Sequence, residues 1–193
     1  MATQNERREA TRAALVAAAR EAFVDNGYDA ASTDAILVRA GLSKGALYHH
    51  FPNKADLLGA VFESVLGEAA AAAHSAATRA PDSRSAVAVS LKAWLRAVLL
   101  PVPRRIILET GPAVLGFARA RSLEEPINLA PLRRTIEQAV AKGEAVCEDP
   151  DLAARLLSAA VAELALVAME RDQGDAGMAS FDRRIDALID ALL

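Results

Sequence analysis

The spacing of apolar residues most constrains how this chain of 193 residues can fold. Apolar and polar residues hardly ever alternate with the period of two that a half-buried strand requires, whereas apolar residues recur at intervals of three and four throughout. A first helix, expected over about residues 6–25, shows the pattern in the stripe Leu15, Ala18, Ala19, Ala22 and Phe23. The pattern predicts an all-α fold.

The N-terminal part of the chain has the signals for a helix, a tight turn and a second short helix. Ser32 is a good N-cap for a helix ending near Arg39, and Gly41 permits the left-handed backbone of a sharp turn. Ser43 can cap the next helix, which must end before Pro52. A helix-turn-helix is therefore expected here.

The rest of the chain predicts further helices of unequal length. Asn53 can cap a long helix reaching about Thr78, and Pro81-Asp82 opens another. Five prolines and two glycines interrupt residues 101–131, which predicts two or three short helices there, including 104–109 and 112–121. A helix over 132–142 and two closing helices, one beginning at Asp149-Pro150, complete the prediction.

Composition narrows the class of protein. The chain is 53% apolar with a formal net charge of −3, which is too apolar for a disordered protein. Its longest stretch free of charged residues, 69–78, is shorter than the ~18 residues that span a membrane, and its polar N-terminus lacks the apolar centre of a secretory signal. We expect a cytoplasmic protein with no membrane partner. The single Cys147 has no partner for a disulfide or a metal site, so no cofactor or metal is predicted.

Charge is distributed unevenly around the predicted helix-turn-helix. Residues 35–55 contain no Asp or Glu but include Arg39, Lys44 and Lys54. A helix advances about 100° per residue, so if Leu47 and Phe51 point inward, the opposite face carries Gly45, Ala46 and His49. Small residues beside a polar donor suit a DNA major groove, and Lys44, Tyr48 and Lys54 suit phosphate oxygens. The alternative is a solvated helical corner that binds nothing.

Four segments of the N-terminal region resemble the DNA-binding segment of the TetR family of transcriptional regulators. They are Gly27-Tyr28, residues 32–36, residues 40–51 and residues 53–58. The resemblance implies a helix-turn-helix DNA-binding domain over 1–52 and a larger helical ligand-binding and dimerisation domain over 53–193. Ala31 and Leu37 depart from the family pattern, which often has Thr and Ala there.

The resemblance also implies a function and DNA contacts. It implies a homodimeric, ligand-responsive repressor that recognises a palindromic double-stranded DNA operator, and it implies no enzymatic activity. The residues expected to contact DNA are Ser32, Thr33, Arg39, Ser43, Lys44, Gly45, Ala46, Tyr48, His49 and Lys54.

In this family the last two helices pair with those of a second subunit, and a small molecule binds among the middle helices. The expected dimer interface comprises Leu156, Leu164, Phe181, Ile185, Leu188 and Leu192; the alternative is that these stripes face only the chain's own core. The expected ligand-binding residues are Phe62, Trp94, Leu95, Ile107, Leu115 and Phe117, each of which could equally be core. Arg105, Glu109 and Arg119 could anchor a polar ligand group or lie at the surface.

Two other classes of function stay open. An all-α enzyme or carrier is the first, although His49 and His50 diverge by about 100° and no catalytic constellation or phosphate loop is visible. The second is a regulator of the same fold that responds to no small molecule or that activates transcription.

Overall fold

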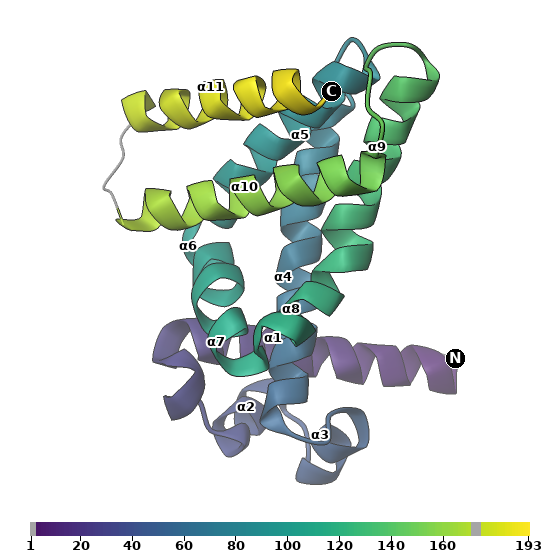
Figure 1. The fold of residues 1–193 in the computed structure, drawn as a ribbon. Coiled ribbons are helices and arrows are strands. Elements are labelled where there is room, and N and C mark those ends of the chain that lie inside the picture. The colour runs from purple at the N-terminus through teal and green to yellow at the C-terminus, as the bar shows by residue number, and fades with distance from the viewer. Residues whose placement is uncertain (1–2, 171–174) are drawn as a thin grey trace.

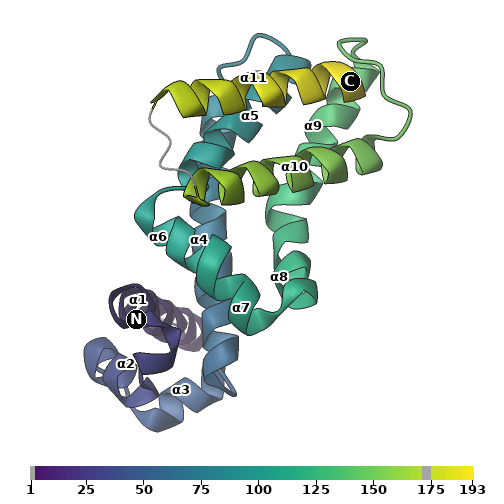
Figure 2. The same ribbon diagram turned by 60° about the vertical axis from the view of Figure 1, so that its left-hand side comes forward.

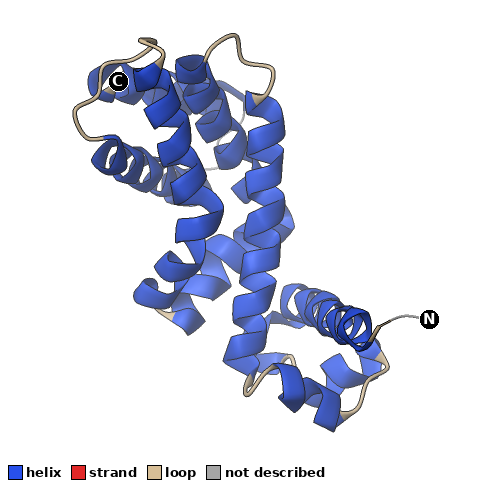
Figure 3. Cartoon of the chain, turned by 90° about the vertical axis from the view of Figure 1, so that its right-hand side faces the viewer, coloured by secondary structure: helices blue, strands red, loops and turns tan. Residues whose placement is uncertain are grey.

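The computed structural model describes residues 3–170 and 175–193, and every described element is helical (Figure 3). This confirms the predicted all-α class. Three helices form the N-terminal end of the molecule, and one long helix joins them to the remainder (Figure 1). These four helices are α1 (Gln4–Ala30), α2 (Thr33–Ala40), α3 (Lys44–His50) and α4 (Lys54–Ala77).

Capping residues set the boundaries of these helices. The side chains of Ser32, Ser43 and Asn53 accept hydrogen bonds from the backbone N–H three residues further on, at 3.1, 3.3 and 2.9 Å. Gly41 has φ 65°, and Gly27 interrupts α1 with φ 78°. The expected helix start signals and the tight turn are confirmed, and the regular part of α1 stops at Gly27, close to the expected end near residue 25.

The other long helices form the far end of the molecule. In Figures 1 and 2, α10 and α11 lie across the end opposite α1 to α3, against α5 and α9. Their bounds are α5 (Ser83–Val98), α9 (Ala130–Ala141), α10 (Pro150–Glu170) and α11 (Asp175–Leu192).

The segment between α5 and α9 is more broken than expected. The predicted helix over 112–121 is wrong, because Gly116 adopts φ 75° and divides it. Two π-helical turns also occur here. The elements are α6 (Pro101–Pro103), η1 (Arg104–Thr110), α7 (Gly111–Leu115), α8 (Phe117–Glu124) and η2 (Glu125–Leu129).

Helix α4 is the central element of the core. Its side chains Leu58, Phe62 and Leu66 are fully buried, and α1, α5, η1, α7 and α8 all pack against it. By length and mean hydropathy alone, α4 and α10 could each span a membrane, but 56% of the apolar window of α4 is buried against 28% of that of α10. The apolar face of α4 is thus covered by the protein itself, while α10 keeps an exposed apolar face.

Candidate nucleic-acid interface and cavity

Helix α3 presents the two faces that its sequence predicts. Leu47 and Phe51 are only 2% and 4% exposed and fix the helix on the small N-terminal core. The opposite side exposes Ser43, Lys44, Gly45, Tyr48 and His49, and Ala46 is half-buried beside them. A short helix therefore projects a face of small residues with polar donors at its edges.

Lys54 lies beside this face, in the first turn of α4. Its Nζ sits 4.3 Å from the centre of the Tyr28 ring and donates a hydrogen bond to the Asp29 carbonyl at 3.4 Å. These contacts orient the ammonium group at a helix N-terminus, where the free backbone N–H groups also attract an anion.

The remaining candidate contacts lie on or just before α2. Ser32 is exposed and Thr33 is half-buried. Arg39 forms ion pairs of 3.2 Å with both Glu21 and Asp25 of α1. Exposed pairs of this kind contribute only about 0–1 kcal/mol, so a phosphate can replace the carboxylates.

His50 belongs to a different surface from His49. Burial, followed by the charges of His49, Arg8 and Arg12, lowers the pKa of the His50 side chain, which favours its neutral form. Arg12 also stacks over the Phe51 ring at 5.5 Å. His50 thus belongs to the contact between α3 and α1.

The two departures from the family pattern are packing residues. Ala31 and Leu37 are 2% and 6% exposed and lie in the core beneath α2. Neither side chain is available to a DNA phosphate.

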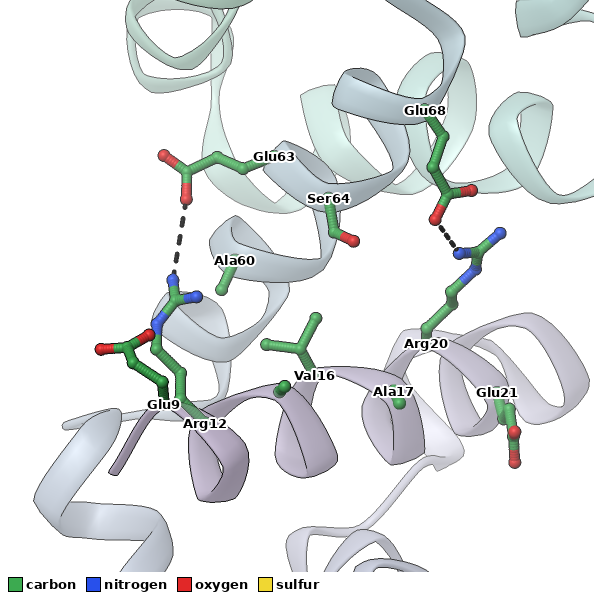
Figure 4. Close-up of a pocket in the computed structure, with 11 residues that line it drawn as sticks. Glu9, Arg12, Val16, Ala17, Arg20, Glu21, Ala60, Glu63, Ser64 and Glu68 are labelled. Carbon is green, nitrogen blue, oxygen red and sulfur yellow. Dashed lines mark hydrogen bonds and ion pairs between the residues drawn. The ribbon is translucent and has the colours of Figure 1, made fainter. Parts of the chain in front are cut away.

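A hollow of about 690 Å³ lies between α1 and α4 (Figure 4). Figure 4 shows Arg12 and Arg20 of α1 reaching Glu63 and Glu68 of α4, at 4.0 and 2.5 Å, on either side of Val16. Sequence analysis missed these pairs because nothing in the sequence aligns the two helices. They link α1 to α4 across the mouth of the hollow.

A second cavity, of about 510 Å³, lies between α10 and the elements from α5 to η2 and is open to solvent, since its lining residues Phe117 and Leu166 are 82% and 42% exposed. Of the expected ligand-binding residues, Trp94, Ile107 and Phe117 line it. Phe62, Leu95 and Leu115 do not: the first two are completely buried in the core, and Leu115 packs against that core.

Sequence analysis also missed the polar lining of this cavity. Arg121, Glu124, Asn128 and Glu163 contribute to its wall. Burial is the main effect on Glu124 and raises the pKa of its carboxyl, while the charge of Arg121 lowers it. No sequence signal distinguishes this glutamate from its neighbour Glu125, which pairs with Arg155 at 3.7 Å.

A smaller cavity of about 70 Å³ adjoins this second cavity, and Trp94 and Asn128 line both. The Trp94 Nε1 atom is buried and has no hydrogen-bond partner among the described residues. Among residues 3–170 and 175–193, no three His, Cys, Asp or Glu side chains gather as a metal site.

The three charged residues left open in the middle region do not line the cavity. Arg105 pairs with Glu109 at 3.2 Å and lies above Gly27 of α1. Arg119 of α8 crosses to α4, where it pairs with Asp56 at 2.6 Å and lies over Gly59. They connect the middle helices to the N-terminal unit.

The expected interface residues differ in accessibility. Leu156 is 46% exposed, whereas Phe181 and Ile185 are 4% and 0% exposed and belong to the chain's own core. Leu164, Leu188 and Leu192 are partly buried against the same core. Phe181 and Ile185 are therefore removed from the expected interface, because α11 uses them to pack on its own chain.

These features define a class of protein: a helix-turn-helix unit with an exposed second helix, joined by one long helix to a helical domain that contains a cavity. The chain belongs to the TetR family of bacterial regulatory proteins. A model of that family's DNA-binding region matches residues 15–61, and one described as the tetracyclin repressor-like C-terminal domain matches 84–192. Its members are DNA-binding transcriptional regulators.

Individual relatives support this assignment. A TetR-family transcriptional regulator from Pectobacterium atrosepticum has a crystal structure that is similar over 100% of this chain and 98% of its own, with 32% identity and a TM-score of 0.81. RolR, crystallised with its ligand resorcinol, shares the fold at 23% identity and a TM-score of 0.76, over 98% of this chain and 90% of its own.

The similarity to FasR, a transcriptional activator from Mycolicibacterium smegmatis, is confined to part of each chain. The two are 37% identical over 87 residues, which are 45% of this chain and 40% of FasR.

Proposed function

We propose that this protein is a homodimeric, ligand-responsive transcriptional repressor that recognises a palindromic operator. The observation that carries the proposal is the exposed face of α3, held outward by the burial of Leu47 and Phe51. A helix presented in this way suits the major groove of DNA.

Each exposed residue of the interface has a distinct proposed role. Gly45 and Ala46 let the backbone of α3 approach the base pairs closely, and His49 bonds base edges. Lys44, Tyr48 and Lys54 bind phosphates along the groove walls. Further contacts to the DNA backbone come from residues at or before the start of α3. They are the hydroxyls of Ser32, Thr33 and Ser43 and the guanidinium of Arg39.

The exposed face of α10 supports the proposed dimer. Its exposed positions recur at alternating intervals of four and three, and they are Leu152, Leu156, Ala159, Glu163, Leu166 and Glu170. This is the spacing with which two helices pack along a seam. A second copy would cover Leu152 and Leu156, together with Leu164, Leu188 and Leu192 where these reach the surface, while Ala159, Glu163 and Leu166 also border the larger cavity. Two α3 helices would then read half-sites about one DNA turn, or slightly more, apart.

The proposed ligand response rests on the position of the larger cavity. Helix α8 lines this cavity through Phe117 and Glu124, and the same helix reaches Asp56 of α4 through Arg119. A ligand that shifts α8 would therefore shift the first turn of α4 and the spacing of the α3 helices. Such a ligand weakens DNA binding only to the extent that it binds more tightly to the spacing of the α3 helices that does not fit the operator. The coupling free energy between ligand and DNA binding is typically about 1–3 kcal/mol.

Activation is the second candidate, favoured by the partial similarity to the activator FasR. A protein bound upstream of a promoter can recruit polymerase, and one bound across it excludes polymerase. For the repressor and for the activator alike, we propose a cytoplasmic location and no membrane partner.

The test is fluorescence anisotropy of the purified protein with the DNA flanking its own gene, at two salt concentrations and against unrelated DNA. Tight, salt-sensitive binding that prefers the flanking DNA is expected. Tyr48→Phe and Lys54→Ala should weaken binding to every sequence, while His49→Ala should change the base preference of the half-site.

Arg183→Ala serves as the control, because it removes an exposed positive charge from α11, at the opposite end of the molecule. The proposed contacts fail if Tyr48→Phe and Lys54→Ala bind the operator as tightly as Arg183→Ala does.

A further inference from the structure

The chemistry of the larger cavity's wall restricts what can bind there. Most of its lining is apolar, and the rings of Trp94 and Phe117 form part of it together with Ile107, Leu108 and Leu166. A cavity of about 510 Å³ with such a lining suits an organic molecule with an apolar body.

Two partly or fully buried polar groups in this wall lack a partner among the described residues, the Trp94 Nε1 atom and the Glu124 carboxyl. The Glu124 carboxyl is partly buried, and among the described residues it forms no ion pair, whereas the adjacent Glu125 pairs with Arg155. Burial raises the pKa of Glu124 because the charged carboxylate has lost water without gaining a full replacement. A positively charged group of a ligand would stabilise the carboxylate in place of the water that burial removes.

The other charges around the cavity favour the same sign of ligand. Glu163 of α10 adds a second carboxylate to the wall, and Arg121 contributes the one guanidinium within the described lining. Two carboxylates against one guanidinium repel an anionic head group and attract a cationic one. Aromatic faces such as those of Trp94 and Phe117 also attract cations.

We propose that this cavity binds a lipophilic cation, with the ligand's protonated amine against Glu124 and its apolar body against Trp94, Ile107 and Phe117. The inference rests on the ligand response proposed above and specifies the chemical class of the effector. Glu124 is the residue that selects for positive charge.

Trp94 provides a direct readout, because it is the only tryptophan in the chain and it lines the cavity. Three probes carry a phenyl ring on a four-carbon chain and differ in the group at its other end: 4-phenylbutylamine, 4-phenylbutanol and 4-phenylbutyrate, whose fourth carbon is the carboxylate. Each is titrated into the full-length protein while tryptophan fluorescence is followed. The amine should bind about tenfold more tightly than the alcohol, as expected for one charge-assisted contact, and the butyrate most weakly.

Variants test whether Glu124 causes the tighter binding of the amine. Glu124→Gln keeps the shape of the side chain but removes its charge, so it should lower amine affinity about tenfold and leave alcohol affinity unchanged. Glu148→Gln, which removes an exposed carboxylate from the loop before α10, should leave all three affinities unchanged. Arg121→Gln removes the competing cation and should strengthen amine binding, which tests the proposal independently of Glu124.

Three results would overturn the inference: equal binding of butyrate and amine, an unchanged preference in both Glu124→Gln and Arg121→Gln, or no fluorescence change with any probe. The operator assay on the same samples separates this inference from the proposed function. Operator binding without probe binding overturns only the ligand inference, and probe binding without operator binding overturns only the proposed function.

Discussion

Two glycines in helical conformation have opposite surroundings. A Cβ atom at Gly111 would lie 2.5 Å from the Phe62 ring and 2.8 Å from the Ile106 carbonyl oxygen, while one at Gly67 would have no heavy atom within 4 Å. Gly111 thus permits the close approach of α7 to α4. Gly67 provides no such contact and only costs helix stability.

Alanine substitutions at these positions should therefore change stability in opposite directions. Gly111→Ala should lower the free energy of unfolding by about 1–3 kcal/mol through overpacking. Gly67→Ala should raise it by about 0.5–1 kcal/mol. Urea denaturation followed by circular dichroism measures both, and a stabilised Gly111→Ala would contradict the close packing of α7 on Phe62.

Glu124 should make stability depend on pH. Burial raises its pKa in the folded protein above its usual value, so the folded state retains a proton that the unfolded state has lost. Stability contributed by this group is therefore lost as pH rises from the usual carboxyl range through the raised pKa. Glu124→Gln should be more stable than the native protein at neutral pH and equally stable in acid below the usual carboxyl range.

Urea midpoints of the two proteins across this pH range test the expectation. Glu148→Gln is the control and should show no such pH-dependent difference. A difference that stayed constant with pH would assign the effect to packing instead of charge.

Among the helices, local sequence signals were enough to predict the boundaries that are set by capping residues. Ser32, Ser43 and Asn53 cap the helices that they predict, because a capping hydrogen bond involves only residues three apart. The broken segment between α5 and α9 was not predictable in detail. The π-helical turns η1 and η2 pack against α4, and the sequence pattern did not show that Gly116 would take a positive φ and divide the expected helix.

The difference between local signals and packing between helices also explains which residues of the candidate sites could be predicted. The outward face of α3 follows from helical geometry, so its residues could be chosen from the sequence. Phe62 and Trp94 are both buried aromatic residues at helical spacing, yet only Trp94 lines the cavity. Which apolar residue borders a cavity depends on the placement of neighbouring helices, which the sequence pattern does not specify.

The ion pair between Arg119 and Asp56 connects two elements, and it should contribute a measurable coupling. A double-mutant cycle with Arg119→Ala and Asp56→Ala should give a coupling of about 0.5–1 kcal/mol in the free energy of unfolding. The cycle cancels the other contributions of Asp56 at the start of α4. The pair Lys44 and Asp34, 3.9 Å apart with side chains 65% and 78% exposed, is the control and should give a coupling near zero.

If the two cycles gave equal couplings, the ion pair between Arg119 and Asp56 would not couple α8 to the start of α4. The proposed route from the cavity to the N-terminal helices would then have to pass elsewhere, for example through Arg105 above Gly27.

In the molecule as a whole, the two C-terminal helices differ in how far the chain itself covers them: α11 is fastened to α5, and α10 keeps exposed leucines. Three aspartates of α11, one turn apart, pair with α5: Asp182 with Arg96 at 2.6 Å, Asp186 with Lys92 at 2.5 Å and Asp190 with Arg84 at 2.7 Å. Together with the burial of Phe181 and Ile185, these pairs fasten α11 to its own chain. The exposed leucines of α10 have no such cover.

Leu156→Asp should therefore dissociate the proposed dimer. The substituted carboxylate would be buried against an apolar seam, at a cost of several kcal/mol. Sedimentation equilibrium should show a monomer with unchanged helical content, whereas Val146→Asp, at an 88% exposed position on the preceding loop, should remain dimeric.

Operator binding should weaken together with the dimer. A dimer binds its second half-site as an intramolecular event, whereas a monomer must bind each half-site from solution. Leu156→Asp should consequently lose affinity for the full palindrome while retaining the native affinity for an isolated half-site. Equal loss on both DNAs would mean that the substitution disturbs the N-terminal unit, and an intact dimer would mean that the seam lies on another face.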